Sequence, residues 1–223
     1  MNAPGNLMPE IANIPVLYSF RRCPYAMRAR MALRAAEITV VLREVDLSNR
    51  PGEMLSHSPK GSVPVLVLPD DQVIDESLDI MKWALGKNDP TKWLETESAG
   101  AHELIAANDG EFKHHLDRYK YPEWHAGAIR TEHRTQAEIF FRTLEQRLTE
   151  HAFLDSDRPS ILDAAIAPFV RQFAAVDEQW FAASPYPALQ NWLARFLRGE
   201  TFLKVMAKQP AWKNGDAPVF FPE

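Results

Sequence analysis

Strand signals in this chain stop before residue 76, and that limit constrains its fold more than any other feature of the sequence. Short apolar runs predict strands at 14–20, 39–47, 63–68 and 72–75. Between them lie a helical pattern that begins at about Pro24, a short irregular helix within 48–62 and a helix at 76–85. Because Asp70 and Asp71 suit a hairpin turn, we expect a four-stranded mixed sheet flanked by helices.

The rest of the chain is predicted to be helical. A polar stretch at 87–93 with a central proline favours a linker. Helical patterns follow at 99–119, 131–151, 161–176, 188–197 and 202–207. The tail is irregular, although Phe220 and Phe221 are apolar enough to pack back onto the body. We therefore expect an α/β domain at 13–88 and an all-helical domain at 92–215.

Composition excludes several functional classes. The chain has 223 residues, 46% of them hydrophobic, which suits one compact unit or two small domains. Its net charge of −5, without a long basic run, argues against a nucleic-acid partner. No stretch approaches the roughly 20 apolar residues of a membrane helix, and the first residues lack the pattern of a secretory signal. We expect a cytoplasmic protein.

The single cysteine, Cys23, is the strongest candidate for a reactive group. It lies between the first expected strand and a helix that Pro24 can open, where unpaired N–H groups and the helix dipole favour a thiolate. Five arginines surround it in sequence: Arg21, Arg22, Arg28, Arg30 and Arg34. A free cysteine is more often a small buried hydrophobe, but this position favours the reactive interpretation.

The residues after Cys23 define the class of thiol chemistry. Ala26 stands where a dithiol oxidoreductase would carry its resolving cysteine, and the chain has no second cysteine. A disulfide formed at Cys23 must therefore be resolved by an external thiol, for which glutathione is the abundant cytosolic candidate.

Two other patterns are better explained by structure than by chemistry. His114 and His115 are adjacent and cannot share a helix face, and no metal-ligand spacing appears along the chain, so we expect a surface helix and no metal. Ser160 and Asp163 could form a catalytic pair, but a serine followed three residues later by an acid, at the start of a helical pattern, favours a capping box.

The order of four motifs resembles the glutathione transferase family, nearest to the omega class and its bacterial relatives. The motifs are FRRCPYAMRARMAL, NRP, SPKGSVPVL and DES before a helix, and PSILDAA in the second half also matches. The resemblance covers nearly the whole chain and is weakest at 99–119 and in the tail. It implies a thioredoxin-like N-terminal domain, an all-α C-terminal domain and a cysteine-type enzyme that uses Cys23 as its catalytic residue.

The resemblance also implies a glutathione site. Val63 would pair its backbone with the cysteinyl part of glutathione beside a cis peptide bond to Pro64. Glu76 would hold the γ-glutamyl ammonium, and Ser77 would hold the γ-glutamyl carboxylate at a helix N-terminus. Taken without the family, Pro64 fits an ordinary strand start, and the Glu76–Ser77 pair fits a plain helix cap equally well.

Two further residues complete that implied site. Arg50 falls where the family often has lysine and would bind the glycine carboxylate, for which a guanidinium is well suited. Tyr25 would line the pocket of the glutathione sulfur. Helices of the second domain would wall the pocket of a second, electrophilic or disulfide substrate.

The function implied is a glutathione-dependent thiol transferase or reductase acting through a mixed disulfide at Cys23. Deglutathionylation, dehydroascorbate reduction and related reductions stay open, and aromatic conjugation should be weak because a cysteine replaces the hydroxyl that activates glutathione. Glutathione is the expected co-substrate, with no membrane partner, and the family permits a homodimer. The alternative is a non-catalytic binding or assembly module of the same fold.

Overall fold

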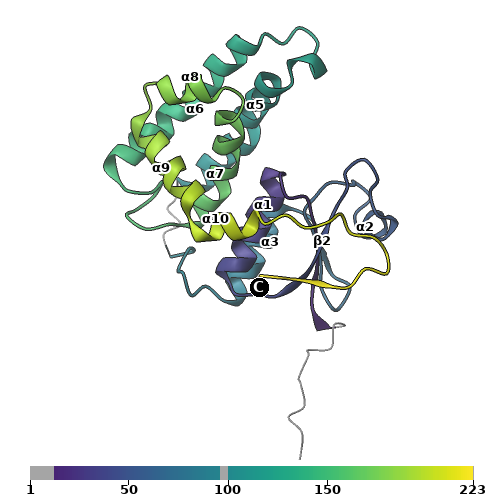
Figure 1. The fold of residues 1–223 in the computed structure, drawn as a ribbon. Coiled ribbons are helices and arrows are strands. Elements are labelled where there is room, and N and C mark those ends of the chain that lie inside the picture. The colour runs from purple at the N-terminus through teal and green to yellow at the C-terminus, as the bar shows by residue number, and fades with distance from the viewer. Residues whose placement is uncertain (1–12, 96–99, 223) are drawn as a thin grey trace, which may run out of the picture. The chain divides into compact units, whose positions relative to one another are not determined.

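The computed structural model describes residues 13–95 and 100–222 and divides the chain into two compact units. The first contains residues 1–88 together with 205–223, and the second contains residues 89–204 (Figure 1). Within the described residues, no helix combines the length and the apolar character needed to cross a membrane.

A mixed sheet forms the centre of the first unit, as the sequence predicts. Its strands are β1 (Val16–Ser19), β2 (Val40–Glu44), β3 (Val65–Val67), β4 (Val73–Ile74) and β5 (Val219–Phe221). They lie in the order β4-β3-β1-β2-β5, with β1 parallel to β2 and the other pairs antiparallel. The central strand β1 is almost fully buried, with Leu17 at 0% exposure.

The fifth strand corrects the expected four-stranded sheet. Residues of β5 pair with the outer edge of β2, placing Phe221 opposite Val40, so the expectation that the chain after residue 91 is entirely helical is wrong. The tail from residue 205 belongs to the first unit, which also removes residues 205–215 from the expected helical domain. A three-residue strand after an irregular segment has too short a pattern to be recognised, whereas pairing it covers an exposed sheet edge.

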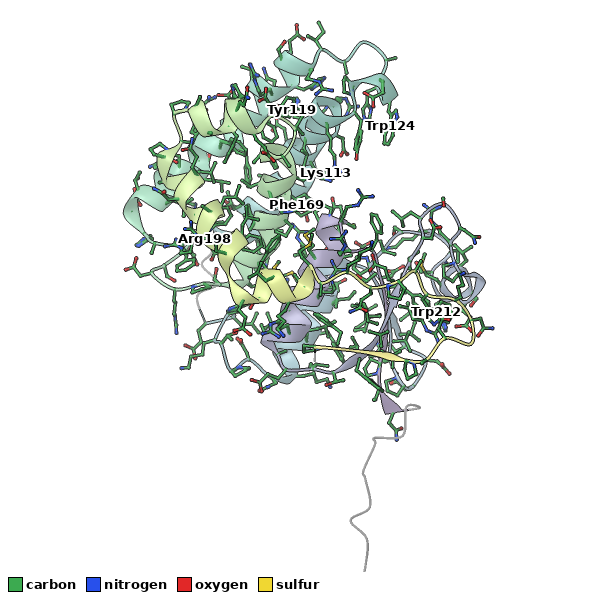
Figure 2. All side chains as sticks on the ribbon, in the orientation of Figure 1. Lys113, Tyr119, Trp124, Phe169, Arg198 and Trp212 are labelled. Atoms are coloured by element: carbon green, nitrogen blue, oxygen red, sulfur yellow. The ribbon has the colours of Figure 1, made fainter. Side chains whose placement is uncertain are left out.

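Contacts of Trp212 hold this returning tail in place. Its backbone N–H donates to the Glu44 carbonyl at 2.8 Å, and its ring meets the edge of the Tyr18 ring at a centroid distance of 6.2 Å. The guanidinium of Arg43 lies 4.0 Å from the ring centroid of Trp212, which is labelled in Figure 2. The tail is therefore packed against β1 and β2 by side chains as well as by the strand ladder.

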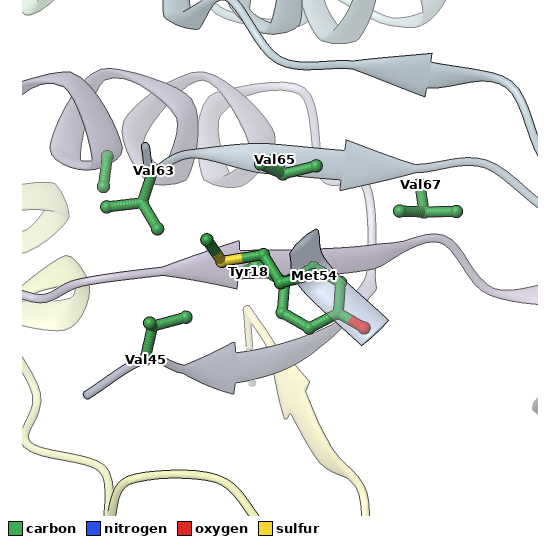
Figure 3. Packing of buried hydrophobic residues seen from close by; sticks show 7 residues of the cluster. Tyr18, Val45, Met54, Val63, Val65 and Val67 are labelled. Carbon is green, nitrogen blue, oxygen red and sulfur yellow. The ribbon is translucent and has the colours of Figure 1, made fainter. Parts of the chain in front are cut away.

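Three helices accompany the sheet: α1 (Pro24–Ala35), α2 (Gly52–His57) and α3 (Ser77–Lys87). Helices α1 and α3 pack against each other (Figure 1). Figure 3 shows a core cluster of Tyr18, Val45, Met54 from α2, Val63, Val65 and Val67. Cys23 is partly buried against this cluster, so the segment around Val63 and the start of α1 are fixed to one core.

The second unit is helical in its described residues. Its helices are α4 (Ala101–Ala107), the π-helical η2 (Asn108–Phe112), α5 (Lys113–Lys120), the 3-10 turn η3 (Pro122–Trp124), α6 (Arg130–Glu150), α7 (Ile161–Ala174), α8 (Glu178–Ala183), α9 (Pro187–Arg198) and α10 (Glu200–Val205). Phe141 and Phe173 pack at a centroid distance of 4.7 Å, and Phe112 lies 5.5 and 5.7 Å from them. The six-residue α8 was not predicted, because it is too short for a helical period to show.

Ser160 and Asp163 form the predicted capping box at the start of α7. One Asp163 oxygen accepts from the Ser160 N–H at 3.0 Å and the Ser160 hydroxyl at 2.8 Å. The other accepts from the Leu154 N–H at 3.1 Å and from the indole N–H of Trp192 at 2.8 Å. A single buried carboxyl group thus joins the α6–α7 loop, the α7 N-terminus and α9.

Replacing Asp163 with alanine should lower the free energy of unfolding by about 3 kcal/mol or more. Three buried N–H donors would lose their acceptor, at about 1–3 kcal/mol each. Asp177→Ala is the matched control, since Asp177 caps the exposed end of α8 and its loss should cost only about 1 kcal/mol. Urea unfolding followed by circular dichroism measures both. Equal costs for the two variants would contradict the role assigned to Asp163.

Candidate active site

Cys23 occupies the position that the sequence predicts, between β1 and α1. It is the N-cap residue of α1, with extended backbone angles, and Pro24 takes the first helical position. Its backbone N–H donates to the Phe20 carbonyl at 3.0 Å, and its carbonyl accepts from Met27 at 2.9 Å. The half-buried thiol therefore lies at the positive end of a twelve-residue helix.

The cis peptide bond between Val63 and Pro64 lies beside this thiol, in agreement with the prediction for that dipeptide. The Cys23 Sγ atom is 3.6 Å from the carbonyl oxygen of Val63, within hydrogen-bond distance for sulfur. Val63 itself is 7% exposed and belongs to the core cluster. The sulfur and the backbone of Val63 are thus held together by well-packed residues rather than by a free loop.

Arg30 interacts electrostatically with the thiol of Cys23. Its side chain is 1% exposed and donates to the Ser19 hydroxyl and, at 2.7 Å, to the Arg21 carbonyl. Burial lowers the pKa of Arg30 to about 10, while attraction to Glu44 and to Cys23 opposes that shift. Arg30 therefore remains a cation at neutral pH, and its charge favours the thiolate form of Cys23.

Arg28 has a different environment from the one expected. It is completely buried, lies over the Tyr25 ring at 5.4 Å and directs its Nη1 atom to the Ser77 hydroxyl at 3.4 Å. The structure thereby brings Tyr25 and Ser77, far apart in sequence, around one guanidinium. The sequence predicts Arg28 only as one of the five arginines around Cys23, since nothing in the sequence distinguishes a buried arginine in α1 from an exposed one.

The start of α3 brings together more charged groups than the sequence predicts. Ser77 is the first helical residue and is 5% exposed, whereas Glu76, its N-cap residue, is exposed. Lys60 reaches Glu76 at 2.6 Å and Asp75 at 3.2 Å, and the Ser58 hydroxyl donates to Asp75 at 2.7 Å. Lys60 and Asp75 were not predicted as site residues, although both lie within the matched motifs.

These contacts shift the pKa values of Asp75 and Lys60. The hydrogen bond from Ser58, helped by Lys60 against the opposing effect of burial, holds the pKa of Asp75 below its usual range. Burial works against the Lys60 cation, but hydrogen bonds to Glu76 and Asp75 raise the pKa of Lys60 overall. At neutral pH, Asp75 is ionised and Lys60 is charged beside it.

Arg50 lies apart from these residues, just before helix α2. It is exposed, and its Nε atom donates to the Gly61 carbonyl at 2.7 Å. Gly61 has a φ of +63°, a conformation that favours glycine, and a Cβ there would approach Leu55 at 3.3 Å. The bond ties Arg50 to the turn that leads into the cis peptide.

The seven predicted site residues therefore all lie in the first unit, in four local groups. Cys23 contacts Val63, which the cis peptide bond joins to Pro64. Tyr25 and Ser77 both contact Arg28, Glu76 contacts Lys60, and Arg50 contacts Gly61. Their roles toward a ligand remain predictions.

Comparison with known protein families gives a consistent result. The model of the glutathione S-transferase N-terminal domain matches residues 17–93, and the model of the C-terminal domain matches residues 120–195. The chain belongs to the glutathione S-transferase family. The thioredoxin-like first domain and helical second domain agree with that membership and confirm the fold class predicted from the sequence.

Relatives of this glutathione S-transferase include members of the omega class. The chain is 27% identical to pyrimidodiazepine synthase of Drosophila melanogaster, over 88% of this chain and 83% of that one. It is 27% identical to the mouse omega-1 glutathione S-transferase, over 86% and 80% of the two chains. Identity to the rat omega-2 enzyme reaches 39%, over 34% of this chain and 30% of that one.

Solved structures share the fold. A glutathione transferase family member from Pseudomonas fluorescens, solved with two glutathione molecules, superposes with a TM-score of 0.75 at 18% identity, covering 88% of this chain and 94% of that one. The URE2P6 transferase from Phanerochaete chrysosporium, solved with oxidised glutathione, gives 0.74 at 17% identity, covering 86% and 94%.

Proposed function

We propose that this glutathione S-transferase is a cysteine-type thiol transferase that works through a mixed disulfide between Cys23 and glutathione. The observation that carries the proposal is the position of the Cys23 sulfur at the α1 N-terminus. There it lies 3.6 Å from the Val63 carbonyl oxygen and interacts electrostatically with Arg30. A hydroxyl-type transferase would have serine or tyrosine as the activating group. A thiolate can itself attack a disulfide.

Glutathione fits the residues around this thiol. Its extended cysteinyl backbone would pair with Val63 beside Cys23, in the manner of an added strand. Its γ-glutamyl carboxylate would accept from the hydroxyl and N–H of Ser77, at the N-terminus of the eleven-residue α3. Glu76 would take the ammonium group, with Lys60 orienting its carboxylate, and Arg50 would bind the glycine carboxylate. Tyr25 would line the sulfur end of the site.

The proposed reaction has two disulfide exchanges. The Cys23 thiolate attacks the glutathione sulfur of a substrate disulfide, the S–S bond breaks, and the substrate leaves as a thiolate that takes a proton from water. A second glutathione, as its thiolate, attacks the glutathione sulfur of the mixed disulfide at Cys23. Oxidised glutathione leaves and the Cys23 thiolate returns. The net reaction reduces one substrate disulfide and oxidises one molecule of glutathione.

The helical domain expected at 92–215 would form the pocket of the second substrate. Residues 205–215 are excepted, because they belong to the first unit. The proposed second substrate is a small disulfide or electrophile. Dehydroascorbate-type reductions are among the proposed reactions. The relatives are named for different activities, one as pyrimidodiazepine synthase and others as omega-class glutathione S-transferases, so they do not select one substrate.

A non-catalytic binding module is the competing proposal. It would bind glutathione without turning over a disulfide, and it would have no need of Cys23. Retention on glutathione-agarose tests binding, and reduction of a glutathione mixed disulfide tests turnover. Retention without turnover supports the binding module, whereas both together support the transferase.

Replacing Ser77 with alanine should weaken glutathione binding by about 1–3 kcal/mol, the usual effect of losing a hydrogen bond to a charged group. Calorimetric titration with glutathione measures the change. Ser56→Ala is the matched control, because Ser56 is exposed on α2 and donates to the carbonyl of Glu53.

The same substitution removes one hydrogen-bond partner of the buried Arg28, so thermal unfolding should be measured alongside. A lower affinity in a protein that is still folded supports Ser77 as a ligand. Equal affinities for wild type, Ser77→Ala and Ser56→Ala would remove Ser77 from the site.

A further inference from the structure

Three histidines of the second unit come together on neighbouring helices. His114 and His115 lie on α5, and His133 lies in the first turn of α6. Each offers a ring nitrogen, and the three nitrogens lie within 4.8 Å of one another. The ring centroids are 5.0, 5.1 and 6.1 Å apart, so the imidazoles form a compact triangle.

We propose that His114, His115 and His133 bind a divalent transition metal ion, with Zn²⁺ as the reference ion, and that the ion links α5 to α6. Imidazole is a preferred ligand of Zn²⁺, Cu²⁺ and Ni²⁺. No metal is expected from the sequence, because no metal-ligand spacing appears along the chain. The third ligand comes from the next helix, and eighteen residues separate His115 from His133.

The geometry requires only small side-chain movements. Ligands of a tetrahedral Zn²⁺ at about 2.0–2.1 Å are about 3.3 Å from one another. The Nδ1 atoms of His115 and His133 are 2.8 Å apart and would separate slightly, while the ring of His114 would approach them. The ion would replace the direct contact between the two Nδ1 atoms, and each bound ring would then carry its proton on Nε2.

The surroundings leave room for a further ligand. A surface hollow of about 370 Å³ is lined by His115, His133 and polar neighbours that include Glu132. Three imidazoles leave one tetrahedral position, which water from this hollow could fill. All three histidines are partly or fully accessible, so an ion can reach them without unfolding the helices.

Charges near the triangle act in both directions. Glu111 and Glu132 place carboxylates near the triangle, where their negative charge would favour a bound cation.

Arg118 opposes metal binding through its charge. Its Nη1 atom lies 3.0 Å from Nδ1 of His114, so its guanidinium would repel a dication bound at the triangle. Removing the Arg118 charge should therefore tighten the site. A general effect of histidine content would not predict this gain.

The test is a Zn²⁺ titration of the full chain against a chromophoric chelator. Cys23, as the only cysteine, is first alkylated so that its thiol cannot bind the ion. Wild type should bind one equivalent. His133→Gln should weaken binding at least about tenfold, and His115→Gln with His133→Gln should abolish it.

Two further variants sharpen the result. His151→Gln, at the exposed end of α6, is the matched control and should leave the affinity unchanged, while Arg118→Gln should raise it. Thermal unfolding without metal verifies that each variant folds, and added Zn²⁺ should raise the midpoint of wild type but not of the double variant. Equal Zn²⁺ affinity in wild type and a folded double variant, or no binding by wild type, would overturn the proposal.

Discussion

Cys23→Ala should reduce the reduction of a glutathione mixed disulfide by at least about a thousandfold, while glutathione binding stays within about twofold of wild type. The proposed reaction forms a covalent bond at the Cys23 sulfur, and no second cysteine can replace it. The proposed glutathione contacts at Val63, Glu76 and Ser77 do not depend on that sulfur. The assay couples the release of oxidised glutathione to a reductase, and calorimetry measures binding.

Cys23→Ser provides a second comparison. A hydroxyl at the α1 N-terminus can stabilise a bound glutathione thiolate, so this variant should lose thiol transfer and gain weak conjugation of an aryl halide. Full thiol-transfer activity in Cys23→Ala would place the chemistry elsewhere. Loss of activity together with loss of glutathione binding would point to a damaged pocket instead, which thermal unfolding can detect.

Local patterns made the position of Cys23 predictable from the sequence. A strand signal, a proline after the cysteine and an Ala- and Met-rich helical run together place Cys23 at a strand–helix junction, and the structure has it there. The capping box of Ser160 and Asp163 was predictable for the same reason, because both members lie within four residues. Such features depend on the backbone close to them in sequence.

Features that depend on packing were not predictable. The strand β5 is recognisable only once the open edge of β2 is known, and the tail carries a pattern of just three residues. Lys60 meets Asp75 and Glu76 across fifteen or more residues, and Arg28 meets Ser77 across 49. The histidine triangle is the same case, since His133 approaches His115 only because α5 and α6 pack side by side.

Arg30 is expected to contribute to the reactivity of the thiol. A nearby cation favours the thiolate, so Arg30→Met should raise the pH midpoint of Cys23 alkylation by at least about half a unit. Arg34→Met is the matched control, because Arg34 lies in the last turn of the same helix, away from the thiol end. Its midpoint should stay close to that of wild type. Because Arg30 is buried, circular dichroism should accompany the measurement.

The alkylation rate of wild-type Cys23 as a function of pH tests the central claim most directly. Only one thiol can react, so the profile has a single source. If the α1 N-terminus and Arg30 stabilise the thiolate as proposed, the midpoint will lie below about 7.5, within the range of activated cysteines. A midpoint near about 8.5, the value of an unperturbed cysteine, would contradict the account and favour the binding module.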